Sequence, residues 1–582
     1  MKKIVYLIAI TALLPSLFGC EDFLDTQSYT TKNSETFPRT EEDADQMLTG
    51  VYGVMNLIMD ANPSVSYFLN AEIASDDRFG GGGTNDRGMQ AVNHLLYTDR
   101  NQFLSFWRDH YLGVSRSTAA ITALETMEDG DVKNQKLGEA KVLRSYFYFE
   151  LVQFLGDVPL MTAAPANVEE AMESPAQSSQ EEIFKQIGTD LWEAYNAMPS
   201  VQWNTHPSGT VTKWVAAGML ARVWLFYTGF YGKTALPTNE GEVTAEQVAA
   251  ALKDCIDHSG HQLAADYRSL WPYTNSVTKP DYPFAADAPT WILDGHNPEH
   301  MFVVKHFGLS SWNGDLLRFT NQIALYFGIR NNGQANRYET VFPIGQGWGM
   351  GTVSTVLWDQ WVADEPDDIR RKASIYNVAE EGEGYEYGGD NQMEETGLWQ
   401  KKISPVVAYG KGGDPAALFN SFFSSTAYEG YPGDDFQCGN ASDVALLRYA
   451  DILLMHSEIT KTADGMNAVR QRVGLPAVAY SEEALRKERR YELAFEGLRW
   501  GDIRRWGIAE QALSSMYNTP IYNGGIRTTI KPQGGAGDVA ARYQATKGFF
   551  MIPQGEIELA DGALKQNAGW EGSEAVFSSY AN

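Results

Sequence analysis

The chain has 582 residues and a formal net charge of −28 at pH 7. Nucleic-acid binding requires a basic surface, so this charge excludes that class of function, and it also disfavours adsorption to anionic lipid. The 15 Trp, 29 Tyr and 27 Phe residues are enough to build a core and still supply aromatic binding surfaces.

The N-terminus has the pattern of a bacterial lipoprotein signal. Two lysines precede the apolar run from Ile4 to Leu14, which is too short to span a membrane as a helix. Leu17-Phe18-Gly19-Cys20 follows and resembles a lipobox, in which the cysteine takes a lipid and becomes the mature N-terminus. Phe18 departs from that pattern, because a small residue is commoner there. An ordinary secretory signal with an incidental cysteine remains the alternative.

We therefore expect residues 1–19 to be a signal peptide and residues 20–40 to be a tether that carries a lipid on Cys20. The acidic stretch from Glu21 to Asp25 resembles the export tags of surface lipoproteins in the Bacteroides group. The signal features predict a soluble body tethered by lipid, and the resemblance of the acidic stretch implies that it lies on the outer membrane, exposed at the cell surface.

The next segment, residues 41–260, has the periodicity of a helical-repeat domain. Apolar residues recur at three- and four-residue spacing, and Ser179 with Glu182 forms a capping box that predicts a helix start. A glycine-rich stretch over residues 78–88 predicts a flexible loop, and it lacks the pattern of a phosphate loop. The predicted helices are 41–59, 101–128, 137–155, 179–197, 213–228 and 244–255.

Helical periodicity fades in residues 261–440, where Gly, Pro, Asn and Trp become frequent, and we expect a loop-rich insertion that carries the ligand site. Helices return in residues 441–582, with predicted helices at 444–460, 465–472 and 481–496. Gly497 fits a C-terminal cap of the last of these. The predicted fold is thus mostly α, a tetratricopeptide-like helical-repeat scaffold with a long irregular insertion.

Two cysteines remain besides Cys20, namely Cys255 and Cys438. An exported protein permits a disulfide, but two distant cysteines define no framework, so their pairing stays open.

Four blocks of sequence resemble the SusD/RagB family of nutrient-binding outer-membrane lipoproteins. Their order and distribution match the family over nearly the whole mature chain. Small departures, such as Thr118 where an Asn is common, do not affect the fold. The blocks are Glu139–Leu160, Leu447–Glu458 with Met466–Gly474, Glu488–Trp500 continuing through Asp502 to Trp506, and Ile552–Ile557 with Leu564–Trp570.

The resemblance implies a helical, tetratricopeptide-like cell-surface lipoprotein. It implies a SusC-like, TonB-dependent outer-membrane transporter as partner. It implies capture of a glycan, or in some members a peptide, and delivery into that barrel. A peptide- or protein-binding lipoprotein on the same scaffold is therefore the alternative function.

Charged residues are dense in the third block, which could suggest acid–base chemistry. Arg and carboxylate residues at three- and four-residue spacing pair naturally, so we predict a buried ion-pair network instead. The same interpretation gives Arg144 the partner Glu150, and Arg448 the partners Asp451 and Glu458. The residues of the third block concerned are Arg489, Arg490, Glu492, Glu496, Arg499 and Asp502.

A sugar ring has an apolar C–H face that matches an aromatic ring, and a hydroxyl rim that matches amide and charged groups. Two regions offer such groups: the glycine-rich stretch and residues 271–361. Trp312 and Trp348 stand in glycine-rich or polar contexts that do not suit a core. The residues predicted to bind ligand are Asp77, Arg78, Asn85, Asp86, Trp312, Asn313, Tyr326 and Trp348. Other aromatic candidates, for which core packing is the more ordinary interpretation, are Trp271, Tyr273, Tyr282, Trp291, Trp358 and Trp361, whereas Trp107 and Trp214 fit a core.

No arrangement of nucleophile, base or metal ligands can be assembled from spacing, so the chain is not predicted to be an enzyme. No cofactor is expected. A structural calcium ion on loop carboxylates is possible from the composition, although no ligand set can be named.

Overall fold

The computed structural model describes residues 37–60, 62–163, 176–293, 295–307, 317–330, 340–407, 440–533 and 537–577. Predictions for Cys20, Trp312, Asn313 and Cys438 lie outside these residues. Cys255 is a buried thiol, and burial raises its pKa to about 12. None of the helices in the described ranges is long and apolar enough to cross a membrane.

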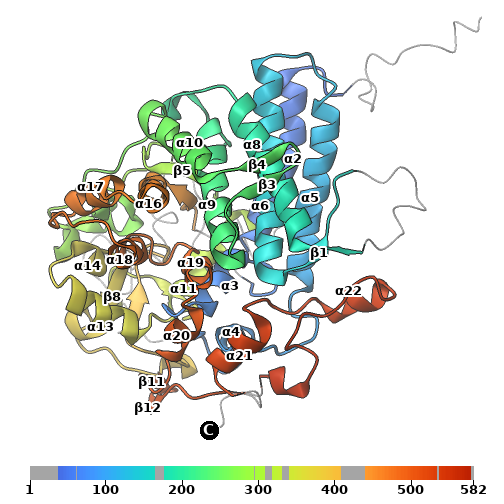
Figure 1. The fold of residues 1–582 in the computed structure, drawn as a ribbon. Coiled ribbons are helices and arrows are strands. Elements are labelled where there is room, and N and C mark those ends of the chain that lie inside the picture. The colour runs from blue at the N-terminus through green and yellow to red at the C-terminus, as the bar shows by residue number, and fades with distance from the viewer. Residues whose placement is uncertain are drawn as a thin grey trace, which may run out of the picture.

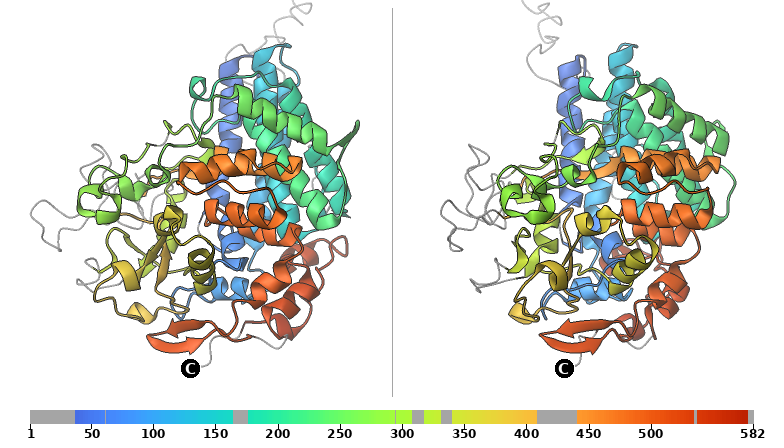
Figure 2. Two further views of the ribbon diagram at one scale, coloured as in Figure 1. Left: turned by 60° about the vertical axis from the view of Figure 1, so that its left-hand side comes forward. Right: turned by 90° about the vertical axis from the view of Figure 1, so that its left-hand side faces the viewer.

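Long helices stand side by side and form the N-terminal part of the molecule (Figures 1 and 2). Helix α6 packs between α5 and α8, while α2 covers α5 and α9 packs on α8. A continuous apolar core runs through these helices and extends into the C-terminal ones. Their bounds are α2 (Glu41–Ile58), α5 (Leu104–Leu124), α6 (Asp131–Leu155), α8 (Gln180–Ala197), α9 (Lys213–Tyr231) and α10 (Ala245–His258), with the short α3 (Tyr67–Ala74) and α4 (Arg87–Asn93).

The prediction of a mostly helical, tetratricopeptide-like scaffold is confirmed, and the helix starts follow local chemistry. The Ser179 hydroxyl accepts from the backbone N–H of Glu182, and the Glu182 carboxylate accepts from the N–H of Ser179, as the capping box predicts. Trp107 and Trp214 are buried, as expected for core residues.

Of the C-terminal helices, α16 packs on α9 and α10, and α19 packs on α9 (Figure 1). Helix α16 is preceded by a strand over residues 444–448 that pairs with β5 (His300–Val304), so the predicted helix 444–460 is too long at its start. The bounds are α16 (Tyr449–Thr460), α17 (Asp464–Arg472), α18 (Glu482–Glu492), α19 (Arg499–Arg505), α20 (Ala509–Ser514), α21 (Val539–Thr546) and α22 (Gln554–Leu559).

Gly497 is not the cap of a helix that reaches residue 496, because α18 already ends at Glu492. Its φ is +77°, its N–H donates to Glu72 Oε1 over 2.7 Å, and an added Cβ would lie 2.8 Å from the Phe68 ring. The glycine therefore allows the C-terminal motif to approach α3 closely.

Short helices and two-stranded ribbons make up the described parts of residues 261–440. They have apolar clusters of their own, which contain Trp271, Tyr273, Tyr282 and Trp291 in one and Trp358 with Trp361 in another. These six aromatic residues are core, not binding residues. The helices are α11 (Gln322–Phe327), α13 (Thr355–Asp364), α14 (Ile369–Ser374) and α15 (Val378–Glu381).

All sheets in the described residues have two strands, and only the β6–β7 pair is parallel. The pairs are β1 (Val158–Pro159) with β2 (Gln177–Ser178), β3 (Leu236–Thr238) with β4 (Gly241–Val243), β5 (His300–Val304) with β10 (Val444–Arg448), β6 (Ile329–Arg330) with β7 (Gln346–Gly347), β8 (Ile375–Asn377) with β9 (Leu398–Gln400), and β11 (Pro520–Asn523) with β12 (Ile526–Thr529).

Candidate glycan-binding surface

Residues 78–83 of the glycine-rich stretch are buried and pack against the segment that carries Trp348. Gly82 N–H donates to the Gly349 carbonyl over 2.8 Å, and Gly351 N–H donates to Gly80 over 2.9 Å. Gly81 has a φ of +65°, and a Cβ there would lie 2.6 Å from the Gly349 oxygen. The prediction of a flexible loop is therefore wrong, because the glycines allow two distant segments to touch.

Tyr326 and Trp348 form a partly exposed aromatic pair. Their ring centroids are 4.8 Å apart and the rings are inclined by 42°. Backbone bonds fix both residues, since Trp348 N–H donates to the Leu325 carbonyl and Met350 N–H to the Tyr326 carbonyl, each over 2.9 Å. Burial raises the pKa of Tyr326, so its phenol stays neutral and can donate a hydrogen bond.

Arg330 connects this pair to the glycine-rich segment. Its Nη1 lies 3.3 Å from Asp86 Oδ2 and 3.3 Å from the Trp348 carbonyl oxygen, and its Nε lies 3.1 Å from the carbonyl oxygen of Asp390. Asp86 in turn accepts from Gly83 N–H over 2.6 Å, and the neighbouring Asn85 is exposed. The structure thus brings the two predicted regions together, and we call the residues Asn85, Asp86, Tyr326, Arg330, Trp348 and Asp390 the Tyr326–Trp348 surface.

Asp77 and Arg78 lie inside the protein, so the prediction that they contact ligand is corrected. Asp77 Oδ1 accepts from Arg490 Nε over 2.8 Å. Arg78 lies between the rings of Phe327 and Phe495, at 4.0 and 4.6 Å from their centroids, and its Nε lies 2.5 Å from Glu72. Its Nη1 donates to the Gly351 carbonyl over 2.7 Å, so it supports the segment after Trp348 from the inside.

Sequence reasoning missed Arg330 and Asp390. Arg330 follows the helix of Tyr326 and opens a polar run, Arg-Asn-Asn, that could have marked it. Asp390 is distant in sequence and had no such signal. Its backbone is in the left-handed region, with a φ of +55°, which presents its carbonyl to Arg330.

The charged third block forms the predicted buried network. Arg489 pairs with Asp451 and Asp502, and Arg490 and Arg499 both pair with Asp76. Burial alone would raise the pKa of Asp451, but the Arg489 and Arg222 guanidinium groups outweigh it and lower that pKa to about 2. Arginines lower the pKa of Asp76 and of Asp451 and so hold both carboxylates ionised, which suits structural locking and not proton transfer.

The predicted partners of two arginines are wrong. Arg144 pairs with Asp190 at 2.8 Å, whereas Glu150 pairs with His110. Arg448 pairs with three glutamates from other segments instead of Asp451 and Glu458; they are Glu299, Glu492 and Glu496.

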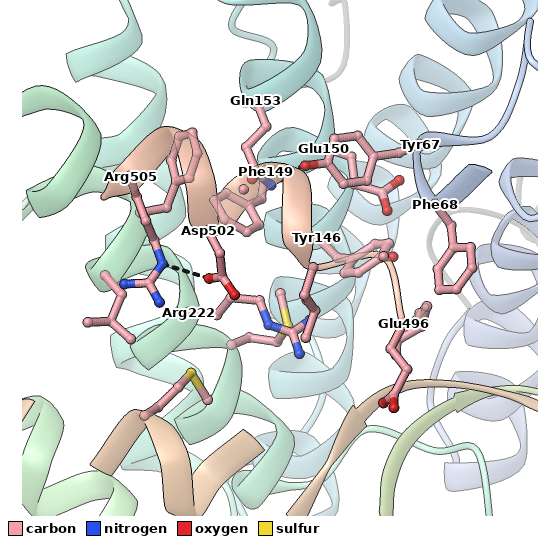
Figure 3. Close-up of a pocket in the computed structure, with 18 of the residues that line it drawn as sticks. Tyr67, Phe68, Tyr146, Phe149, Glu150, Gln153, Arg222, Glu496, Asp502 and Arg505 are labelled. Atoms are coloured by element: carbon pink, nitrogen blue, oxygen red, sulfur yellow. Dashed lines mark hydrogen bonds and ion pairs between the residues drawn. The ribbon is translucent and has the colours of Figure 1, made fainter. Parts of the chain in front are cut away.

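A cavity of about 60 Å³ lies among the helices beside this network (Figure 3). Figure 3 shows Glu150, Arg222 and Asp502 around it together with Tyr67 and Tyr146. Among the residues that the structure describes, none bonds to the buried Nε of Arg222. A space of this size has room for a few water molecules and not for a sugar ring, so it does not compete with the Tyr326–Trp348 surface as a glycan site.

Metal binding has no evident site in the ranges that the structure describes, where no group of three or more His, Cys, Asp or Glu side chains is placed to hold an ion. The calcium ion considered from composition stays a prediction without ligands.

The fold and the site define a mostly helical protein with a partly exposed aromatic pair, and comparison with known proteins identifies the family. A family profile described as "Starch-binding associating with outer membrane" matches residues 22–225, and one described as "SusD family" matches residues 338–570. The chain belongs to the SusD family.

Relatives and solved structures agree with this assignment. "SusD-like protein P2" of Formosa agariphila is 24% identical over 541 residues, which cover 88% of this chain and 92% of that protein. A "laminarin binding SusD-like protein" of known structure is 25% identical, with a TM-score of 0.66 over 92% of this chain and all of that one. "Surface glycan-binding protein A" from Bacteroides thetaiotaomicron, solved in complex with laminarihexaose, is 18% identical, with a TM-score of 0.64 over 90% of this chain and 99% of that one.

Proposed function

We propose that the protein captures a glycan at the Tyr326–Trp348 surface without catalysis. The observation that carries the proposal is the partly exposed Tyr326–Trp348 pair, with polar groups of Asn85 and Asp86 on the neighbouring segment. An aromatic pair matches the C–H face of a sugar, and the amide and carboxylate match its hydroxyls. The names of the relatives support a glycan as the ligand class.

The test is a binding screen of the chain from Glu21 onward against a panel of polysaccharides that includes laminarin. The variant Tyr326→Ala/Trp348→Ala is measured beside it. Trp192→Ala is the matched control, because Trp192 forms another partly exposed ring pair, with Tyr195, at 5.8 Å on α8. We expect one glycan to bind, the double variant to lose it and the control to keep it.

Two outcomes would change the proposal. If the double variant still bound the glycan, the proposed function would stand but the site would lie elsewhere. Trp312→Ala would then test the second predicted tryptophan. A panel without any binder, followed by capture of a peptide, would favour the alternative function. Release of reducing ends from a bound polysaccharide would contradict a non-catalytic role.

We further propose that the captured glycan passes to a SusC-like, TonB-dependent transporter while Cys20 holds the protein on the outer membrane by lipid. The lipobox-like sequence and the family membership support this step. Isolation of the lipidated chain from outer membranes should recover a TonB-dependent barrel in the same complex. A chain recovered alone, under conditions that preserve other membrane complexes, would contradict the partnership.

A further inference from the structure

A second cleft lies away from the Tyr326–Trp348 surface and has no residue in common with it. Its volume is about 410 Å³, and it lies among α9, the end of α16, the start of α18 and the end of α19. Partly exposed aromatic side chains from three segments line it, namely Trp224, Tyr480 and Trp506. This volume falls in the range of small-molecule sites, roughly 300–1,000 Å³.

Cations outnumber carboxylates in the lining of this cleft, although the chain as a whole is strongly acidic: four cations, Lys233, Lys461, Arg486 and Arg505, face two carboxylates, Glu458 and Glu482. The side chains of Lys233, Lys461 and Arg486 are 46%, 58% and 32% exposed. Glu482 is shared between Lys461 at 3.5 Å and Arg486 at 3.4 Å, and Lys233 has an exposed partner, Glu181, at 3.3 Å. Long, exposed pairs of this kind contribute little free energy, so an incoming anion can replace the carboxylate at small cost.

Two of the three aromatic rings of the cleft are held in place by hydrogen bonds within the protein. The Trp506 indole N–H donates to Glu458 Oε1, and that of Trp224 donates to the Val243 carbonyl, each over 3.0 Å. Arg486 lies 5.3 Å from the centroid of the Trp506 ring, which places a cation beside an aromatic surface. Preorganised rings bind with a smaller entropy cost.

We infer that this cleft is a second ligand site, which binds an acidic saccharide. The aromatic rings match the C–H face of a sugar, and the three cations match a carboxylate or sulfate group on it. Arg486 can bind such a group through two parallel N–H donors, while the two lysines act as point charges.

The test is calorimetric titration of the chain from Glu21 onward, at low ionic strength, with oligogalacturonate as the carboxylate probe and galactose 6-sulfate as the sulfate probe. Neutral galacto-oligosaccharide and inorganic sulfate are the two comparison ligands. We expect an acidic sugar to bind more tightly than either comparison ligand, and Lys461→Gln/Arg486→Gln to weaken that binding at least tenfold. Added salt should also weaken it.

The control variant is Lys253→Gln on α10, whose side chain is 56% exposed and paired with Asp257 outside the cleft. It removes one surface cation and should leave binding unchanged. Lys461 is exposed and Arg486 is partly exposed, so unfolding curves of the double variant should stay close to those of the parent.

Several results would overturn the inference. If neutral sugar bound as tightly as acidic sugar, the cations would have no role in binding. If inorganic sulfate bound as tightly as acidic sugar, the aromatic rings would have no role. If Tyr326→Ala/Trp348→Ala abolished the binding of acidic sugar and Lys461→Gln/Arg486→Gln preserved it, the acidic sugar would bind at the Tyr326–Trp348 surface and not in the cleft. Absence of any binding at millimolar concentration would also refute the site. Because the glycan screen uses different residues, each proposal can fail while the other stands.

Discussion

Arg330 lies 3.3 Å from Asp86, a residue 244 positions earlier in the chain, and the contact joins the two segments of the candidate binding surface. The same guanidinium reaches the Trp348 carbonyl, so one side chain fixes the aromatic ring relative to the acidic group. Its side chain is only 21% exposed. Arg330 is therefore a positioning residue more than a direct ligand contact.

Arg330→Ala should lower glycan affinity about tenfold, or roughly 1.4 kcal/mol, because the ring and the carboxylate lose their common support. Arg330→Lys should recover part of that loss, since a lysine restores charge without the forked donors. Isothermal titration measures both, with unfolding curves to verify the fold. Equal affinity in all three proteins would show that the surface does not depend on Arg330.

Gly81→Ala should destabilise the protein and weaken glycan binding together. The φ of +65° and the approach of a Cβ to the Gly349 oxygen at 2.6 Å both oppose a side chain there. Gly53→Ala on α2 is the matched control, because nothing lies within 4 Å of its added Cβ. The control should be neutral or more stable by about 0.5–1 kcal/mol, since alanine favours helix. Urea unfolding measures the stability of each variant, and calorimetric titration measures its glycan affinity. A Gly81→Ala protein with unchanged stability and affinity would refute the close packing.

Arg78→Met should cost about 3–5 kcal/mol of stability, because it leaves the Glu72 carboxylate buried without its charge partner. The double variant Glu72→Gln/Arg78→Met should be less destabilised than the single variant, since no unpaired charge remains. Denaturant unfolding at pH 7 measures the difference. A double variant as unstable as the sum of both single variants would show that the pair contributes no coupling.

Acid should weaken the buried network through Asp451. Its folded-state pKa is lowered to about 2 from an ordinary 3.8, so the associated stability is present above about pH 4 and is lost as pH falls toward 2. A shift of this size corresponds to about 2 kcal/mol. Asp451→Asn should be less stable at pH 7 and should lose less stability than the parent between pH 4 and pH 2. Identical pH slopes for the two proteins would contradict this assignment.

Cys20→Ser should release the protein from the outer membrane, because no lipid could then be attached. Fractionation of cells with an antibody against the chain measures this, and Cys255→Ser is the control, since that thiol is buried. Membrane retention of Cys20→Ser after a salt wash would show that the anchor lies elsewhere.

Helices with regular apolar spacing could be predicted closely, because their signal is local. The segment 179–197 has both the spacing and a capping box, and α8 spans Gln180–Ala197. The prediction for residues 444–460 was partly wrong because their apolar residues fit either a helix or a buried strand. Pairing with β5 makes residues 444–448 a strand. Only the tertiary partner settles such a choice.

The candidate surface could be predicted only where the signal was local to the sequence. Tyr326 and Trp348 stood out by residue type and context, and the structure places them side by side, although ligand contact itself stays a prediction. Asp77 and Arg78 looked exposed because they adjoin glycines, whereas long-range partners bury them. The partner of Arg144 was wrong because Asp190 lies on another helix, and spacing along one helix cannot reveal it.

The bond from Arg490 to Asp77 joins residues 413 positions apart. A chain cut anywhere before Arg490 would leave Asp77 buried without a counterion, and Arg78 beside it would lose the ring of Phe495. The segment after Trp348, which Arg78 supports, therefore cannot take its final form until the C-terminal motif has been synthesised. A chain that lacks the C-terminal motif should therefore lose the arrangement of the Tyr326–Trp348 surface together with its stability, although none of the lost residues belongs to that surface.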